Sequence, residues 1–115
     1  MQLPNAQNAF IDDRKLVDYC LSEDHPIGKH NARVFKAALN YASEDFLELK
    51  NAILEQVTKG TALLTQSNQY GDLYVLDIVL DNPPKRAQVR TSWIIKANEG
   101  FPRLTSCYVI AQMDE

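Results

Sequence analysis

The pattern of apolar and polar residues changes its period once along the chain, close to Gly60. Before this glycine, apolar residues recur at spacings of three and four, which is the period of an amphipathic helix. After it, apolar and polar residues alternate, as in strands that bury one face. The sequence therefore predicts an extended arm at residues 1–12, a helical part at residues 13–59 and a sheet at residues 61–111.

Three helices are expected in the helical part. The first covers residues 13–22 and begins at a pair of aspartates that can accept the free N–H groups of its first turn. The second covers about residues 27–40, where a proline and a glycine open the helix. The third begins after Ser43 as N-cap and ends at Gly60, a residue that tolerates a left-handed cap.

Four strands are expected after Gly60, separated by turns rich in glycine, proline and asparagine. The first begins at residues 62–64 and ends in a polar turn at residues 66–72. In the last strand, strict alternation groups Leu104, Ser106, Tyr108 and Ile110 on one face, and Arg103, Thr105, Cys107 and Val109 on the other. The second strand is expected at about residues 74–80 and the third at 87–96, and the last runs from Arg103 to about Ala111. Alternation sets the even-numbered residues 74–80 of the second strand and the odd-numbered residues 87–95 of the third each on one face.

This order of elements predicts an α+β fold in a single domain, residues 1–115. Short connections favour antiparallel neighbours, so the four strands should form a meander. Three N-terminal helices would then pack on one face of this four-stranded antiparallel sheet and leave the other face partly open.

Composition narrows the class of function. The net charge of −3 argues against a protein that binds nucleic acid by charge alone. The sequence contains neither a signal-peptide core nor an apolar run of membrane-spanning length, so a cytoplasmic location without a membrane partner is expected. Cys20 and Cys107 could form a disulfide in principle, but their apolar surroundings are typical of buried free thiols.

The clearest candidate for chemistry is the basic face of the second helix. Lys29, Arg33 and Lys36 lie at helical spacing on one stripe, with His30 at its edge. Histidine titrates near neutral pH and arginine stabilises charge on phosphate, so this face could contact phosphate with His30 as general acid or base. The alternative is a solvated helix face balanced by nearby carboxylates.

The last two strands offer a second group of polar residues, comprising Arg90, Ser92, Arg103 and Thr105. An arginine beside hydroxyl groups is what a metal-independent ribonuclease needs to hold the scissile phosphate. The alternative is the polar outer face that any half-covered sheet has. The second histidine, His25, is expected to cap or pack at the helix start. No third ligand stands at metal-binding spacing and no cofactor motif occurs, so neither group is expected.

Three segments of the chain form a recognisable pattern. They are Leu3-Pro4-Asn5-Ala6 with Ile11-Asp12 and Lys15-Leu16…Tyr19; His25-Pro26…Gly28-Lys29-His30…Ala32-Arg33-Val34-Phe35; and Trp93-Ile94-Ile95 with Pro102-Arg103-Leu104-Thr105-Ser106-Cys107-Tyr108. Together these segments resemble a bacterial and phage-associated family of small domains without an assigned function. Members of that family occur alone or at the end of toxin-like or phage-head-associated proteins. The layout of helices and sheet is also similar to the barnase and RelE-like nuclease folds.

The sequence is compatible with two functions. In the first, the resemblance implies a small metal-independent ribonuclease or toxin-like domain acting on RNA. In the second, the chain is a non-catalytic interaction module that binds a small cognate protein in a toxin–antitoxin or phage-associated system. For the ribonuclease, the expected catalytic residues are His30, Arg33, Arg103 and Thr105, and the expected substrate-binding residues are Lys29, Lys36, Arg90 and Ser92.

Overall fold

The computed structural model describes residues 1–113, and these form an α+β fold. The three α-helices are spread over residues 13–57, and all of them precede the first strand. No helix in the described part of the chain is long and apolar enough to cross a membrane. The helices are α1 (Asp13–Lys15), α2 (Lys29–Leu39) and α3 (Phe46–Val57), and the strands are β1 (Ala62–Asn68), β2 (Gly71–Asn82), β3 (Lys85–Lys96) and β4 (Arg103–Met113).

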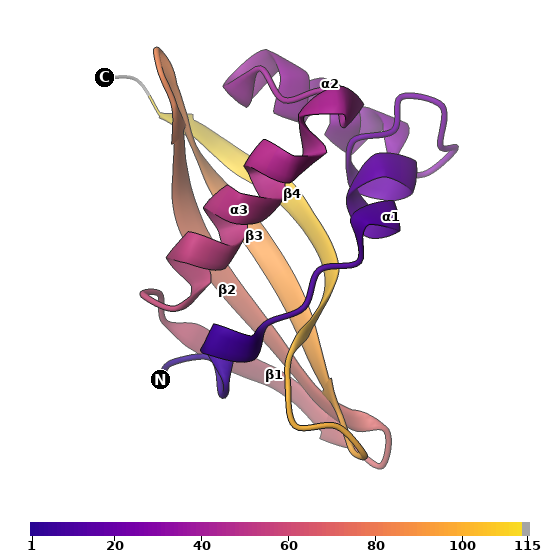
Figure 1. Ribbon diagram of the computed structural model, residues 1–115, viewed down its shortest axis with the longest axis vertical. Helices are drawn as coiled ribbons and strands as arrows, with labels where there is room; N and C mark the ends of the chain where they lie inside the picture. The colour runs from indigo at the N-terminus through magenta and orange to yellow at the C-terminus, as the bar shows by residue number, and fades with distance from the viewer. Residues whose placement is uncertain (114–115) are drawn as a thin grey trace.

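The strands form one antiparallel sheet in the order β1-β2-β3-β4, which confirms the predicted meander. Figure 1 shows them as a twisted sheet with α3 lying across it. β2 and β3 pair without interruption from Gly71 opposite Lys96 to Asn82 opposite Lys85. This order makes β1 and β4 the two edges of the sheet.

The core lies between the helices and one face of the sheet. Trp93 and Leu76 on the strands, and Phe35 on α2, are completely or almost completely buried. Together with the other buried side chains of the helices they form a single hydrophobic cluster. In β2 and β3 burial follows the alternation of the sequence, because one face of each strand packs against the helices. The opposite face of the sheet carries no helix in the part of the chain that the structure describes.

The helices are shorter than predicted, because their ends take other local structures. The first α-helix ends at Lys15 and continues as a π-helical turn over Leu16–Cys20, closed by a bond from the Leu21 N–H to the Leu16 carbonyl. The predicted N-cap Ser43 instead lies in a 3₁₀ turn, Ser43–Asp45. The third helix ends earlier than predicted, at Val57, and Gly60 does not have a positive φ. A left-handed cap is present at the end of α2 instead, at Asn40, where φ is 59°.

The first hairpin is longer than predicted. β1 continues through polar residues to Asn68, within the stretch that the sequence predicted as a turn, and pairs there with Gly71. Gly71 has φ +149°, and a Cβ atom on it would collide with the Ile95 carbonyl of the neighbouring strand. The backbone hydrogen bonds between β1 and β2 therefore continue past the residues whose apolar alternation predicted the strands.

Two irregularities in β4 make the predicted faces of this strand wrong. The pairing with β3 shifts at Ser92/Trp93, where Leu104 and Ser106 are the successive partners and Thr105 is the extra residue. It shifts again so that Ile110 is passed over. As a result, Leu104, Cys107 and Val109 pair with the core-facing residues of β3, whereas Arg103, Ser106 and Tyr108 pair with residues of the open face.

The N-terminal arm is docked against the sheet. Leu3 and Ile11 are buried, whereas Phe10 is 42% exposed. The Phe10 backbone forms a parallel bridge to β4, donating to the Pro102 carbonyl at 2.8 Å and accepting from the Leu104 N–H at 3.0 Å. The arm thus pairs with the beginning of the β4 edge, and the rest of this edge has no backbone hydrogen-bond partner among residues 1–113.

Candidate functional site

The residues expected to form one nuclease site are distributed over two sides of the sheet. His30 and Arg33 lie on α2, in the helical layer. Arg90 and Arg103 lie on β3 and β4, and their register partners belong to the open face of the sheet. Along β4, Arg103 is also separated by up to about 20 Å, at about 3.3 Å per residue, from Val109, which lines the same groove as Arg33.

Arg90 is held by a neighbouring carboxylate on the open face. Its guanidinium makes a bidentate ion pair with Asp77 on β2, at 2.9 and 3.0 Å. The pKa of Arg90 is raised, mainly by its hydrogen bonds to Asp77 and secondly by hydrogen bonding to Tyr108. Ser92, the other residue expected to bind substrate here, stands opposite Ser106. This arrangement is a cross-strand row of polar partners, in which the arginine is already satisfied.

Arg103 is fixed even more completely. It forms a bidentate ion pair with Glu99 at 2.7 and 2.8 Å, and its guanidinium lies 5.0 Å from the ring centroid of Phe10 and 4.9 Å from that of Phe101. Its hydrogen bonds to Glu99 raise the pKa of Arg103 and lower that of Glu99. Arg103 therefore joins the N-terminal arm to the β3–β4 turn. Thr105 lies at the irregularity two residues further along β4.

The basic face of α2 divides between two surroundings. Lys36 lines a polar hollow together with Asp18, Glu23 and Glu44. This agrees with the alternative interpretation, in which nearby carboxylates balance a solvated helix face. Lys29 and His30 are exposed at the beginning of α2, and Arg33 follows one turn later.

His25 has the packing and capping role that the sequence suggested. Its Nδ1 accepts the backbone N–H groups of Ile27 at 3.0 Å and Gly28 at 2.9 Å. Its ring meets the edge of Tyr19 with 4.8 Å between centroids. These contacts fix the turn that leads into α2 and leave His25 a structural residue.

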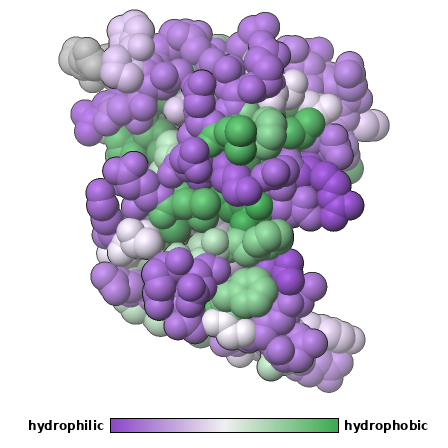
Figure 2. Space-filling view, in the orientation of Figure 1, coloured by the Kyte–Doolittle hydropathy of each residue, from purple (hydrophilic) through white to green (hydrophobic). Residues whose placement is uncertain are grey.

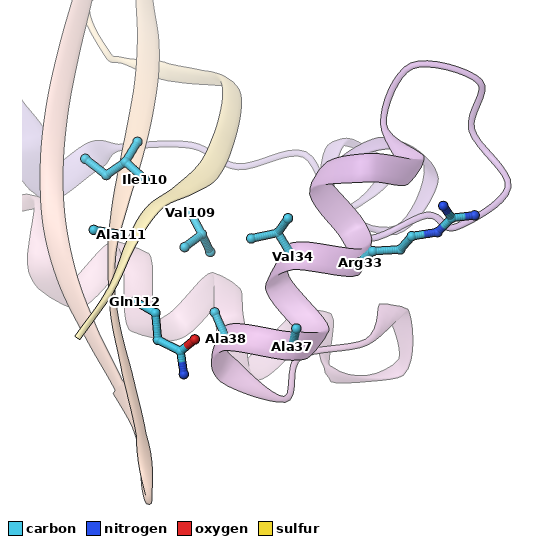
Figure 3. A pocket seen from close by; sticks show the side chains of 8 residues that line it. All are labelled: Arg33, Val34, Ala37, Ala38, Val109, Ile110, Ala111 and Gln112. Atoms are coloured by element: carbon cyan, nitrogen blue, oxygen red, sulfur yellow. The ribbon is translucent and has the colours of Figure 1, made fainter. Parts of the chain in front are cut away.

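A groove of about 410 Å³ runs between α2 and the second half of β4. Figure 3 shows Val34 and Val109 facing one another across it, while Ile110 points away and the Arg33 side chain is directed away from β4. Arg33 is exposed. The small side chains of the α2 residues at the centre of the groove leave the space open. The groove is lined by Arg33, Val34, Ala37, Ala38, Val109, Ile110, Ala111 and Gln112.

Arg33 differs from the other arginines in its charge environment. Arg14, Arg86, Arg90 and Arg103 each have a carboxylate within 4.0 Å, and Arg33 has none among residues 1–113. The groove thus combines an apolar floor with a cation at its rim. Sequence reading found Arg33 by its charge stripe but missed the groove, because Val109 was not expected beside α2.

The described residues contain neither a cluster of metal ligands nor an exposed thiol. Among residues 1–113, no three histidine, cysteine, aspartate or glutamate side chains are grouped as metal ligands would be. Cys20 and Cys107 are both buried free thiols, as their apolar patterns suggested. The hydrogen bond with Cys20 and complete burial raise the pKa of Cys107.

Apolar side chains also reach the surface away from the groove. Figure 2 shows them as separate patches among polar residues on the face that carries α3. Leu47 on α3 is 54% exposed, and Leu63 on β1 lies at the opposite edge from the groove. Neither residue lines the groove beside β4. The groove joins apolar side chains of two elements in one hollow, which makes it the stronger candidate for a binding site.

The chain belongs to a family described as Domain of unknown function (DUF6883), whose model matches residues 2–111. The match covers the helices and nearly all of the sheet, which confirms the expected likeness to a family without an assigned function. No match was found among curated proteins or among solved structures.

Proposed function

We propose that this domain is a non-catalytic protein-interaction module, and that the groove between α2 and β4 binds an extended segment of a partner protein. The partner would be a small cognate protein, as in a toxin–antitoxin or phage-associated system. The observation that carries the proposal is the coincidence of an apolar groove with an unpaired strand edge.

The edge of β4 is suited to pairing with another chain. Within residues 1–113, only Phe10 forms backbone hydrogen bonds to this edge, near its beginning. Natural edge strands are commonly protected by charged residues or proline, yet residues 105–112 contain neither. The other edge strand, β1, is seven residues long against eleven for β4. An added strand beside β4 would gain main-chain hydrogen bonds, which supply affinity in this mode of recognition.

The groove would accept the side chains of such a strand. Alternate residues of an extended peptide point to the same side, so every second side chain would face α2. Ala37 and Ala38 leave room for these side chains, and Val34 and Val109 offer apolar contact. Residues 109–112 would hold about four residues of peptide, or roughly 13 Å.

The competing function is a metal-independent ribonuclease that uses His30 with Arg33 and Arg103. Its proposed groups lie on different layers, and Arg103 is already engaged by Glu99. RNA degradation by the purified protein in the presence of a chelator tests this alternative. Cleavage that is lost in both His30→Ala and Arg103→Ala, in variants that remain folded, would establish the ribonuclease and overturn our proposal.

The interaction proposal is tested by selecting peptides from a random displayed library on the purified domain. We expect selected peptides that bind with roughly micromolar affinity, and a loss of at least about tenfold in Ala37→Trp, which fills the groove. Ala97→Trp, at an exposed position beyond β3, is the matched control and should bind normally. Failure to select any peptide, or equal binding by both variants, would refute the groove as a binding site.

A further inference from the structure

We infer that the segment bound in the groove carries a carboxylate, and that Arg33 selects it. This inference rests on the proposed function and specifies the chemistry of the partner. It concerns a residue at the rim of the groove, whereas the proposed function concerns the groove and the strand edge.

The charge environment of Arg33 supports this assignment. It is exposed, it contributes to the groove lining, and it has no carboxylate partner among residues 1–113. Lys29 lies one helical turn before it and is also exposed, and it forms no ion pair within the same residues. In a protein of net charge −3, this end of the groove is therefore a local positive rim.

The geometry also sets the position of the carboxylate along the bound segment. Val34 and Val109 define the end of the groove near Arg33, whereas Gln112 lies near Ala38 at the other end (Figure 3). A carboxylate at the first end can receive a charge-assisted hydrogen bond from the guanidinium, after that flexible side chain turns toward the strand. The rest of the bound segment would present apolar side chains to the helix.

A second copy of the chain is a less suitable occupant than an acidic segment. Pairing two β4 edges would place two α2 helices on neighbouring subunits. Each copy would then bring the same positively charged groove rim to the interface, and like charges at an interface disfavour association. The sequence of β4 between residues 105 and 112 carries no carboxylate to compensate them.

A double-mutant cycle between the domain and a selected acidic peptide tests the inference. The domain variant is Arg33→Ala, and the peptide variant replaces its aspartate or glutamate by the corresponding amide. We expect each single change to weaken binding by about tenfold or more, and the second change to add little once the first is made. Lys96→Ala, an exposed cation at the end of β3 remote from the groove, is the matched control and should have no effect.

The outcomes separate the inference from the proposed function. Peptides that bind the groove with no enrichment of carboxylates, or with additive effects in the cycle, overturn the acidic partner but leave the interaction module intact. A domain that selects no peptide overturns the proposed function and the inference with it. A dimer that Ala37→Trp dissociates, or RNA that competes for the groove with a steep salt dependence, also contradicts the inference.

Discussion

The indole N–H of Trp93 donates to the hydroxyl of Thr91, two residues earlier on the same face of β3, at 2.8 Å. The Thr91 hydroxyl in turn donates to the Leu76 carbonyl on β2 at 2.6 Å. Both side chains are completely buried. A single threonine thus satisfies the only polar atom of the largest residue in the core, which allows a tryptophan to lie there without an unpaired donor.

Replacing this threonine by valine keeps the shape but removes the hydroxyl. We expect Thr91→Val to destabilise the domain by about 1–3 kcal/mol, because the Trp93 N–H is left buried without an acceptor. Urea unfolding measures the loss. Thr91→Ser, which keeps the hydroxyl, is the control for removal of the methyl group alone. If valine proves no worse than serine, the hydrogen bond contributes nothing to stability.

The ion pair between Glu99 and Arg103 should make stability depend on pH. Hydrogen bonding to Arg103 lowers the pKa of Glu99 below its ordinary value of 4.5. The stabilisation is therefore complete above about pH 4.5 and is lost as the pH falls through the lowered folded-state pKa. Glu99→Gln should be less stable than the wild type at pH 7, and the difference should shrink in acid.

Urea unfolding of both proteins at pH 7 and at pH 3 checks this prediction. Glu55→Gln serves as control, since Glu55 contacts Lys59 only at 3.7 Å with both side chains largely exposed. A difference between wild type and Glu99→Gln that stays constant with pH would contradict the assignment of the stabilisation to an ionised Glu99.

The thiols of Cys20 and Cys107 should be protected in the folded protein. Both are completely buried, so a thiol reagent reaches them only after the structure opens. We expect labelling slower than that of a free thiol by a factor on the order of a thousand or more, and rapid labelling in denaturant. Mass spectrometry after timed labelling measures both rates. Rapid modification of the native protein would place these cysteines at the surface.

The class of fold could be predicted from the sequence because the change of period near Gly60 is a local signal. The faces of β2 and β3 followed from alternation, since each strand buries one side against the helices. The faces of β4 could not be predicted. One extra residue at Thr105 and another at Ile110 each reverse the alternation, and such bulges depend on pairing with β3 rather than on local sequence.

The same limit explains what was missed at the candidate site. The spacing of charged residues predicted that Arg33 is exposed on α2, and this prediction depends only on the helical period of that segment. The neighbour that makes a groove, Val109, is brought there by packing between segments far apart in the chain. Conversely, the sequence predicted Arg90 and Arg103 as phosphate ligands because it does not show their ion-pair partners, which are Asp77 and Glu99.

Amide hydrogen exchange tests the central claim, strand addition beside β4, most directly. Exchange is measured at Val109–Gln112 in the free domain and in its complex with a selected peptide. Strand addition predicts that those amides of this stretch that point to the open edge slow by about tenfold or more, because they gain main-chain hydrogen bonds. Unchanged exchange in β4, with protection appearing at β1 or on the open face of the sheet instead, would contradict it.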